Sequence, residues 1–330
     1  MELVNVLVTS SIGDECLQQV TSVSPKIKVT DVSDLARAER RGNFAFKEQL
    51  DALLAEAEVI YGFRLLKNVI ARTPRLKWIQ MMSAGVDSFL DNEFRQSSVI
   101  MTMVSGIHAT PVGEFVIELM LMFAKQAPLC LHLKQKREWK RFTPTVLRSK
   151  TVGIVGLGDI GREVARLAKA FGMRVLATRR SAKRVARARH VDIVLPPQQL
   201  PQLLSDSDFV VLTLPLTPET NRLISERELR TMKPSAYLIN VSRGNIVDEE
   251  ALIRALDEHW IAGAGLDVFA TEPLPTGSKL WESPNVIFSP HVAGVMEDYN
   301  MRATELFCEN LRRYLSGKRL LNVINKKRRY

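Results

Sequence analysis

Residues 151–161, Thr-Val-Gly-Ile-Val-Gly-Leu-Gly-Asp-Ile-Gly, constrain the fold of this chain more than any other segment. A short apolar run ends in Gly156, Gly158 and Gly161, and a helical pattern follows directly. In a strand–turn–helix unit the first glycine permits a tight turn, the second lets the backbone approach a pyrophosphate, and the third lets the helix pack on the strand. The helix N-terminus also offers unpaired N–H groups to an anion.

The residues around the glycines decide how this spacing is interpreted, because similar spacings also occur in ordinary loops. Val164, Leu167, Ala168 and Phe171 fall on one helical face, and residues 173–178 have the pattern of a second strand. The complete strand–turn–helix–strand unit favours a dinucleotide-binding turn over a structural one.

The residues after the second strand favour NADP(H) over NAD(H). An acidic residue about 20 positions past the glycines commonly accepts hydrogen bonds from the ribose of NAD. This chain has Arg179, Arg180 and Ser181 there instead. Guanidinium groups and a hydroxyl can bind a 2′-phosphate through charge-assisted hydrogen bonds. NAD(H) stays an alternative, because two arginines can also form a solvated loop in a basic chain.

Composition excludes several classes of protein. The 330 residues, 46% of them hydrophobic, suffice for two buried cores. The net charge of +10 comes from basic residues spread along the chain without interleaved aromatic residues, so we expect no nucleic-acid partner. No apolar run approaches the roughly 18 residues that span a bilayer, and no targeting signal is visible, so we expect no membrane contact and a cytoplasmic location. Cys16, Cys130 and Cys308 lie far apart, which predicts buried free thiols and no metal site.

Strand-like and helix-like segments alternate in two regions, which predicts an α/β fold with two domains. Seven strand-like runs from residue 151 to about 290 suffice for a Rossmann sheet, and a long amphipathic helix over 297–316 is expected to return to the first domain. We predict a Rossmann NAD(P)-binding domain over 105–291. A smaller flavodoxin-like α/β substrate domain is predicted over 1–104 and 292–330.

Residues 111–133 predict one long helix with apolar side chains on most of its faces. Such a helix requires burial on more than one side, and a subunit interface would supply it. Trp139 follows this helix and is a candidate for the same interface.

Three short motifs follow the glycine turn, at residues 240–244 (Asn-Val-Ser-Arg-Gly), 265–273 and 289–294. Their order and spacing resemble those of the D-isomer-specific 2-hydroxyacid dehydrogenase family, and in particular its glyoxylate/hydroxypyruvate reductases. The resemblance extends to residues 83–87 and 214–220 and covers nearly the whole chain. It implies hydride transfer between a nicotinamide dinucleotide and a small 2-oxo acid, in a homodimer.

Three candidate catalytic residues each lie past an apolar strand, where an open α/β sheet presents its ligand-binding ends. Arg243 could bind a substrate carboxylate and polarise its carbonyl group, as the arginine of the family does. His291 is suited to donate a proton to the developing alkoxide. Glu272 could hydrogen-bond the imidazole and set its tautomer.

The resemblance also implies ligand contacts that the pattern alone does not reveal. Backbone N–H groups of Ala84, Gly85 and Val86 are expected to bind the substrate carboxylate. His108 and the three remaining histidines are interpreted as structural. The implied cofactor contacts are Asp159 and Ile160 at the pyrophosphate, Pro215 and Thr220 near the adenosine, Val241 beside Arg243, and Asp267 and Gly294 near the nicotinamide. For Asp267 a structural cap is the alternative.

These features together predict a D-2-hydroxyacid dehydrogenase that acts as a 2-oxoacid reductase with NADP(H), on a substrate such as glyoxylate or hydroxypyruvate. The alternative is a dinucleotide-sensing interaction protein like the transcriptional co-repressors of the same family. Such a protein could keep Arg243, Glu272 and His291. The enzyme is favoured because the sequence shows neither long disordered extensions nor a clear nuclear signal.

Overall fold

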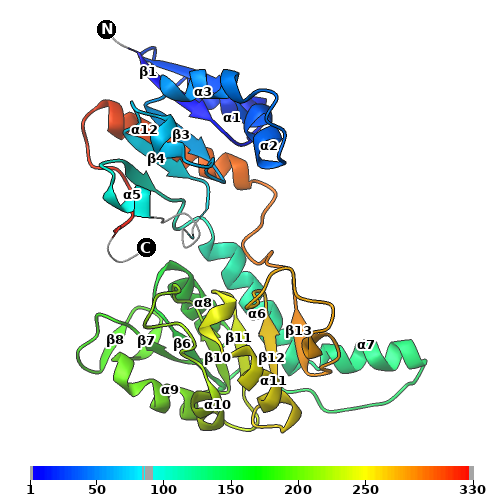
Figure 1. Cartoon of the computed structure of the whole chain (residues 1–330). Coiled ribbons are helices and arrows are strands. Elements are labelled where there is room, and N and C mark those ends of the chain that lie inside the picture. The colour runs from blue at the N-terminus through cyan, green and yellow to red at the C-terminus, as the bar shows by residue number, and fades with distance from the viewer. Residues whose placement is uncertain (1–2, 84, 86–91, 327–330) are drawn as a thin grey trace. The chain divides into compact units, whose positions relative to one another are not determined.

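The computed structural model describes residues 3–83, 85 and 92–326, and Figure 1 shows its ribbon. The chain divides into two compact units. Unit 1 comprises Met1–Ile107 and Met296–Tyr330, and unit 2 comprises His108–Val295. The breaks fall a few residues after the boundaries at 104/105 and 291/292 that the sequence suggests.

Unit 1 is built around a parallel sheet with the strand order β2-β1-β3-β4-β5. This flavodoxin-like order confirms the predicted fold of the smaller domain. Successive residues of a strand face opposite sides of the sheet. Ile60 and Ile79 therefore lie in one apolar core, whereas their neighbours Tyr61 and Trp78 lie in the other. The strands are β1 (Val4–Val8), β2 (Ile27–Asp31), β3 (Val59–Gly62), β4 (Trp78–Met81) and β5 (Ile100–Thr102).

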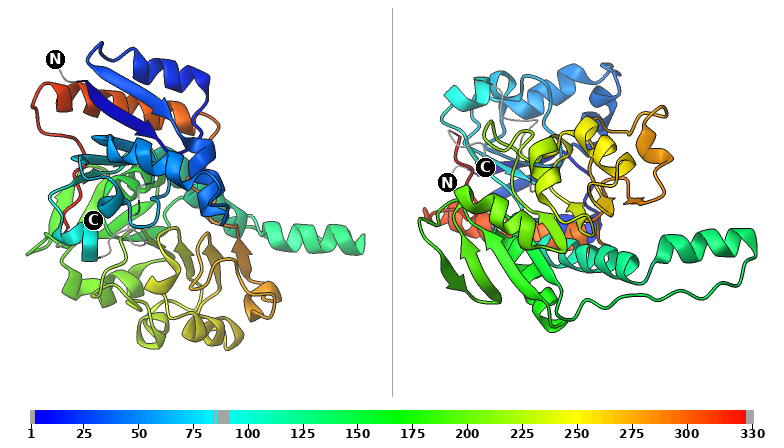
Figure 2. Two further views of the ribbon diagram at one scale, coloured as in Figure 1. Left: turned by 45° about the horizontal axis from the view of Figure 1, so that its top comes forward. Right: turned by 90° about the horizontal axis from the view of Figure 1, so that it is seen from below.

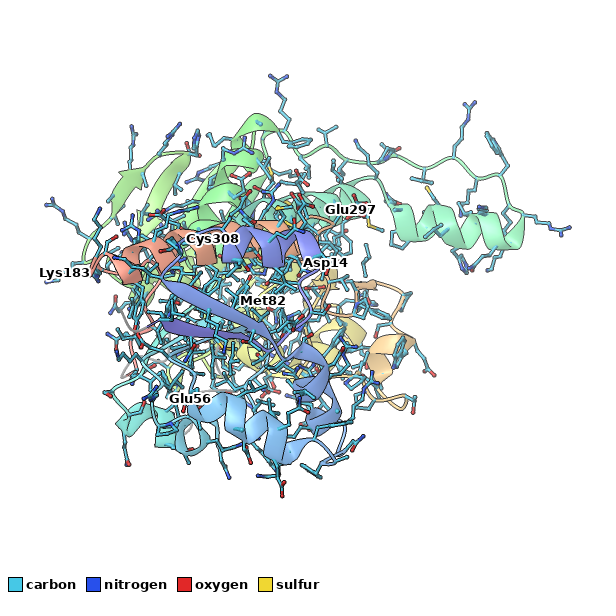
Figure 3. The ribbon with its side chains drawn as sticks, turned by 90° about the horizontal axis from the view of Figure 1, so that it is seen from above. Asp14, Glu56, Met82, Lys183, Glu297 and Cys308 are labelled. Carbon is cyan, nitrogen blue, oxygen red and sulfur yellow. The ribbon has the colours of Figure 1, made fainter. Side chains whose placement is uncertain are left out.

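The helix α12 (Tyr299–Leu315) comes from the far end of the chain and completes unit 1. It lies beside α1 (Asp14–Thr21), as Figure 3 shows for the helix that carries Cys308. Phe307 of α12 is fully buried and stacks on Tyr61 with ring centroids 4.1 Å apart. The other helices of unit 1 are α2 (Ser33–Arg40), α3 (Lys47–Ala55), α4 (Val69–Arg72) and α5 (Asn92–Gln96).

Unit 2 contains a sheet with the strand order β13-β12-β11-β10-β6-β7-β9-β8. Counted from the glycine-turn strand β6, this is the doubly wound Rossmann order, and it reverses between β6 and β10. All pairings are parallel except that of β8 with β9. The strands are β6 (Thr151–Val155), β7 (Arg174–Thr178), β8 (Ala186–Ala188), β9 (Val191–Leu195), β10 (Phe209–Leu212), β11 (Tyr237–Asn240), β12 (Gly263–Leu266) and β13 (Val286–Phe288).

The helices of unit 2 begin at local signals in the sequence. Ser225 and Glu228 form a capping box at the start of α10, and the Asp248 carboxylate accepts a hydrogen bond from the Ala251 N–H in the first turn of α11. The helices are α6 (Ala109–Ala124), α7 (Ala127–Lys136), α8 (Asp159–Ala170), α9 (Leu200–Asp206), α10 (Glu226–Thr231) and α11 (Glu249–Asp257). Short 3-10 turns occupy Pro197–Gln199, Gly244–Ile246 and Lys279–Trp281.

The prediction of one helix over residues 111–133 is wrong. The structure has two helices, α6 and α7, which meet at a bend of 58°. Gln126 between them has a left-handed backbone with φ of 54°. Pro128 lies in the first turn of α7 and has no N–H to donate to a preceding turn. A continuous helix therefore cannot pass this point.

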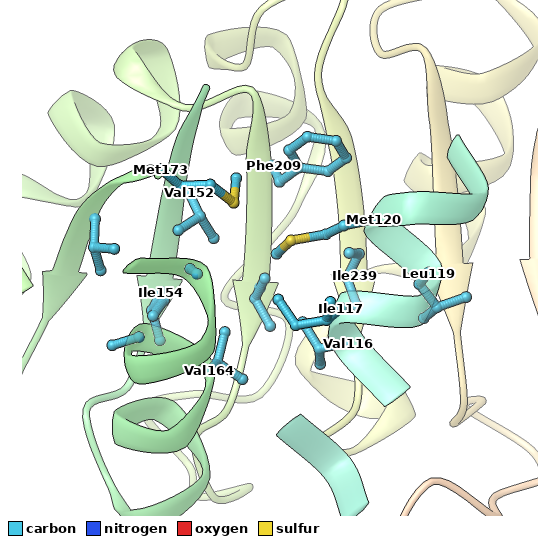
Figure 4. Packing of buried hydrophobic residues seen from close by; sticks show 14 of the residues in the cluster. Val116, Ile117, Leu119, Met120, Val152, Ile154, Val164, Met173, Phe209 and Ile239 are labelled. Atoms are coloured by element: carbon cyan, nitrogen blue, oxygen red, sulfur yellow. The ribbon is translucent and has the colours of Figure 1, made fainter. Parts of the chain in front are cut away.

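Much of the apolar surface of α6 is covered within unit 2. Val116, Ile117 and Met120 pack against the strands that carry Val152 and Ile239, as Figure 4 shows. These three residues are therefore covered within unit 2, whereas Phe115, Leu121 and Met122 of the same helix stay half-buried. By contrast, α7 and the segment after it project from the rest of unit 2 (Figure 2).

No single helix in the described part of the chain is long and apolar enough to cross a membrane. Only α6 and α7 taken together, across their 58° bend, reach that length and composition. All three cysteines are free thiols. Cys16 and Cys308 are buried as predicted, but Cys130 is exposed because it lies on the projecting helix α7.

Candidate active site

The glycine turn of unit 2 is closed by contacts that leave no room for side chains at Gly156 and Gly161. Gly156 has a φ of 103°, and a Cβ there would lie 2.9 Å from the Thr213 carbonyl oxygen. A Cβ at Gly161 would lie 2.3 Å from the Gly156 carbonyl oxygen. The Thr213 hydroxyl donates to that same oxygen at 2.6 Å. The turn is therefore fixed against the end of β10, at the point where the strand order reverses.

The N-terminus of α8 is open on the side where Gly158 lies. A Cβ at Gly158 would meet no atom within 4 Å, and Gly158 itself has no side chain with which to cap the helix. The first N–H groups of α8, on Asp159, Ile160 and Gly161, have no carbonyl partner within the helix. These residues therefore fit the pyrophosphate of a dinucleotide, with Ile160 packed against the core below.

The predicted 2′-phosphate residues lie at the carboxyl end of β7. Arg179, Arg180 and Ser181 are all exposed, and the Arg179 N–H donates to the Leu195 carbonyl oxygen at 3.2 Å. The pKa of Glu219 is lowered mainly by a hydrogen bond with Thr217, and the charge of Arg180 also lowers it. The loop after β10 therefore brings Glu219 near Arg180.

The predicted adenosine residues form part of this same loop. The Thr220 hydroxyl donates to the Pro215 carbonyl oxygen at 2.7 Å, and the Thr217 N–H donates to the Thr220 hydroxyl at 2.7 Å. Thr220 thus fixes the shape of the loop beside the strand-order reversal.

Arg243 lies on a tightly held turn after β11. The Asn240 amide donates to the Arg243 carbonyl oxygen at 3.0 Å and accepts from the Ser242 N–H at 3.1 Å. The Ser242 hydroxyl donates to the Leu212 carbonyl oxygen at 2.6 Å. A Cβ at Gly244 would lie 1.8 Å from the carbonyl carbon of Phe269, so only glycine fits there.

The Arg243 guanidinium is half-buried, and it donates to the Ser242 carbonyl oxygen at 2.7 Å. Val241, the predicted cofactor contact beside it, is buried. Our sequence reasoning missed the contributions of Asn240 and Gly244. The signal was present, because both residues belong to the same five-residue motif as Arg243.

His291 and Glu272 form a direct pair. The His291 Nδ1 lies 2.8 Å from the Glu272 Oε2, and the other carboxylate oxygen of Glu272 accepts from the Phe269 N–H at 3.1 Å. The exposed fractions of the two side chains are 48% for His291 and 37% for Glu272. The Nε2 of His291 is therefore the ring nitrogen left to face a substrate.

Asp267 holds the turn that carries His291. Its side chain is buried, with 2% of the residue exposed. The carboxylate accepts from the Ser289 hydroxyl at 2.6 Å, the Val292 N–H at 2.8 Å and the Ala293 N–H at 3.1 Å. The His291 N–H donates to the Asp267 carbonyl oxygen at 2.9 Å. These contacts agree with the alternative role that the sequence left open for Asp267, in which its carboxylate caps a turn rather than contacting the nicotinamide.

The strand register brings the catalytic candidates to one edge of the sheet in unit 2. Asn240, Leu266 and Phe288 are paired across β11, β12 and β13, and Arg243 and His291 each lie three residues beyond this row. Neighbouring strands are about 4.8 Å apart. An arginine, a histidine and its carboxylate partner therefore share the carboxyl edge, which suits binding and protonation of a small oxo acid.

Gly294 packs against the start of α6. A Cβ at Gly294 would lie 2.8 Å from the Cδ2 atom of His108. The ring of His108 therefore occupies the space that a side chain at this position would need.

In unit 1, the Gly85 carbonyl oxygen accepts from the Ser83 hydroxyl at 2.9 Å. Ala84 and Val86 lie outside the described residues. The hydroxyl of Tyr299 on α12 donates to the Met82 carbonyl oxygen and so anchors the start of this turn.

Comparison with known proteins identifies the family. Residues 117–293 match the family model described as D-isomer specific 2-hydroxyacid dehydrogenase, NAD binding domain. A glyoxylate reductase of Thermococcus gammatolerans is 37% identical over 272 residues, which are 80% of each chain. Glyoxylate/hydroxypyruvate reductase B of Pectobacterium atrosepticum is 38% identical over 315 residues, which are 89% of this chain and 95% of the relative.

A solved structure gives the same assignment. The D-isomer specific 2-hydroxyacid dehydrogenase of Xanthobacter autotrophicus Py2, in complex with NADPH and MES, is 29% identical with a TM-score of 0.84, and the match covers 100% of both chains. All three compared proteins have enzyme names, and nothing favours the alternative of an interaction protein. The chain belongs to the D-isomer-specific 2-hydroxyacid dehydrogenase family, and its function is that of a 2-hydroxyacid dehydrogenase.

Proposed function

We propose that this dehydrogenase prefers NADP(H) and reduces a small 2-oxo acid, such as glyoxylate or hydroxypyruvate, to the D-2-hydroxy acid. The pairing of His291 with Glu272 at 2.8 Å, on the sheet edge that also carries Arg243, is the observation that carries the proposal. The names of the compared relatives support the choice of substrates.

The side chains of unit 2 divide the chemistry between them. The Arg243 guanidinium binds the carboxylate of the oxo acid and polarises the carbonyl group. Bound NADPH supplies the hydride for C2. The Nε2–H of His291 then donates the proton to the carbonyl oxygen, and the reverse transfer accompanies oxidation. Glu272 binds Nδ1–H, which keeps the proton available on Nε2 and stabilises the imidazolium.

The remaining site residues are proposed as ligand contacts. The backbone N–H groups of Ala84, Gly85 and Val86 bind the substrate carboxylate. The proposed cofactor contacts are Gly156, Gly158, Asp159, Ile160 and Gly161 at the pyrophosphate, Pro215 and Thr220 at the adenosine, and Val241 and Gly294 at the nicotinamide. Asp267 is proposed as a positioning residue for the His291 turn.

Initial rates with NADPH and either glyoxylate or hydroxypyruvate test the roles proposed above. His291→Ala is expected to lower kcat by about 10²–10⁴-fold, the usual contribution of a general acid. The matched control is His259→Ala, because His259 is an exposed histidine of unit 2 with a similar left-handed backbone, φ of 58°. Equal kcat values in the two variants would contradict the proposal.

The cofactor preference is tested separately by replacing both Arg179 and Arg180 with alanine. Loss of two charge-assisted partners of the 2′-phosphate is expected to raise the KM for NADPH by about 10–100-fold and to leave the KM for NADH nearly unchanged. Arg187→Ala removes another exposed arginine, from β8, and serves as the control. An unchanged KM for NADPH in the double variant would refute the assignment.

We also propose a homodimer that forms through the projecting arm, defined as α7 and the segment to Val146. Apolar residues on this arm are exposed, Leu131 by 56%, Trp139 by 96% and Val146 by 58%. Burial of such residues against a second copy would remove them from water. The cytoplasmic location stays a prediction from the sequence.

A further inference from the structure

The strand order of unit 1 reverses between β1 and β3, and this point is not used by the chemistry described above. In open parallel sheets, ligands bind outside the carboxyl ends of the strands where the order reverses. Two segments meet there, the turn after β1 that begins at Thr9 and the turn after β3 that contains Phe63 and Arg64.

Hydrogen bonds hold these two turns together. The Arg40 guanidinium donates to the Thr9 carbonyl oxygen at 2.8 Å and to the Arg64 carbonyl oxygen at 3.0 Å. The Phe63 N–H donates to the Ser10 hydroxyl at 2.8 Å. A Cβ at Gly62 would lie 2.1 Å from the Thr9 hydroxyl, so the turns are in direct contact. The backbone of Arg64 is therefore fixed while its side chain stays exposed.

Positive charge at this edge is not balanced by neighbouring acids. Burial lowers the pKa of Arg40, and the charges of Arg64 and Arg37 lower it further. Glu39 acts in the opposite direction, but both of its carboxylate oxygens bind Arg72, at 2.7 and 2.8 Å. Within the described residues, no salt bridge joins an acid to Arg40 or Arg64. An anion would relieve this repulsion.

The register of the sheet relates Arg64 to the proposed carboxylate-binding turn. Gly62 of β3 is paired with Met81 of β4, so Arg64 and Ser83 each lie two residues past the same row. Neighbouring strands are about 4.8 Å apart. The Arg64 turn and the proposed carboxylate-binding turn therefore leave neighbouring strands of the same sheet.

We propose that Arg64 binds a second anionic group of the substrate, so that the enzyme favours 2-oxo acids that carry a carboxylate or phosphate beyond C2. This inference rests on the proposed function and extends its substrate class beyond glyoxylate and hydroxypyruvate, which carry only one acid group. The backbone at Gly85 takes the carboxylate next to the oxo group, and Arg64 takes the distal anion. Arg40 positions the Arg64 turn.

Pairs of substrates that differ in the second acid group test the proposal. 2-Oxoglutarate is compared with 2-oxopentanoate, which lacks only the second acid, and 3-phosphohydroxypyruvate is compared with hydroxypyruvate. Each acidic substrate is expected to have a kcat/KM at least about tenfold above its partner, and the larger ratio identifies carboxylate or phosphate as the preferred group. Both ratios should fall as salt is raised, because the distal contact is electrostatic.

The variants separate binding from folding. Arg64→Gln is expected to lower the ratio within the preferred pair by about tenfold or more, and Arg64→Lys, which keeps the charge but loses the forked geometry, should restore part of it. The control is Arg75→Gln, because Arg75 is an exposed arginine before β4, at the opposite edge of the same sheet, and pairs with Glu56 at 3.0 Å. This control should leave the ratios unchanged.

Two results would overturn the inference while the proposed function stands. One is reduction of the monoanionic substrates with no advantage for either acidic partner, and the other is an equal loss for both members of a pair in Arg64→Gln. Failure to reduce any 2-oxo acid with NADPH or NADH would overturn the proposed function and this inference together.

Discussion

Replacing Asp267 with asparagine tests how the turn that carries His291 is held. The carboxylate accepts from three donors, the Ser289 hydroxyl and the N–H groups of Val292 and Ala293, at 2.6–3.1 Å, and its second oxygen also lies 3.2 Å from the Ala293 nitrogen. Asparagine keeps one acceptor oxygen but loses the negative charge. Its NH2 group would replace the second oxygen and face the Ala293 N–H, which is itself a donor.

The expected cost follows from these contacts. Each hydrogen bond to a charged group is worth about 1.5–3 kcal/mol, against about 0.5–1.5 kcal/mol for a neutral one, so three bonds lose about 1 kcal/mol each. The misplaced donor adds about 1–3 kcal/mol, because Asp267 is 2% exposed and water cannot reach it freely. The total is about 4–6 kcal/mol. Part of it acts on His291, whose left-handed backbone, φ of 56°, depends on this turn.

Urea unfolding and steady-state kinetics measure the two consequences. Asp267→Asn is expected to lower the free energy of unfolding by several kcal/mol and to lower kcat more than tenfold, because only about 1.4 kcal/mol at the histidine corresponds to a tenfold loss. Ser289→Ala removes one donor and should have a much smaller effect, about 1–2 kcal/mol. Wild-type stability with a selective rise in the KM for the cofactor would refute this reasoning and favour a direct cofactor contact.

Three further predictions concern other parts of the chain. Gly244→Ala should destabilise unit 2 by about 3 kcal/mol in urea unfolding and lower activity, because its Cβ would lie 1.8 Å from the Phe269 carbonyl carbon. The control is Gly277→Ala, because a Cβ at Gly277 would meet nothing within 4 Å. Equal stabilities of the two variants would contradict the prediction. Burial alone would raise the pKa of Asp192, but hydrogen bonds from the Val175 N–H and from Lys169 outweigh burial, so the pKa in the folded protein is lowered. The stability that Asp192 contributes to the folded protein is therefore present above pH 3.8 and is lost as the pH falls through the folded pKa. The stability difference from Asp192→Asn, measured by thermal unfolding, should therefore shrink in acid, and a pH-independent difference would count against this linkage. Trp139→Ala should shift the dimer towards monomer in sedimentation experiments, whereas an unchanged dimer with unchanged kinetics would exclude Trp139 from the interface.

The sequence by itself determined the class of the fold and predicted the main site residues. The glycine turn could be predicted because its demands are local: a left-handed φ at Gly156 and close packing at Gly161 admit no other residue type. Most strands of unit 2 could be predicted because runs buried on both faces, such as Thr151–Val155, are mostly apolar, whereas the exposed strand β8 lacks this signal. The motif around Arg243 could be recognised because its residues are consecutive, although contacts with Leu212 and Phe269 also hold the turn.

Some local signals were missed. The break between α6 and α7 depends on Gln126 and Pro128, but the apolar pattern of residues 111–133 concealed it. The helix α2 has few apolar residues, so the alternation of patterns does not reveal it, although Arg40 at its end holds two strand ends together.

Only the tertiary structure decided which distant groups meet. From the sequence alone, Asp267 could either contact the cofactor or stabilise a turn. The register of β12 and β13 brings its carboxylate to donors on residues more than 20 positions away in the sequence. The pairing of β3 with β4 likewise determines that Arg64 lies one strand away from the Ser83 turn. Local sequence sets backbone angles and periodicity, but a hydrogen bond between distant residues depends on strand order and register, which arise from packing of the whole unit.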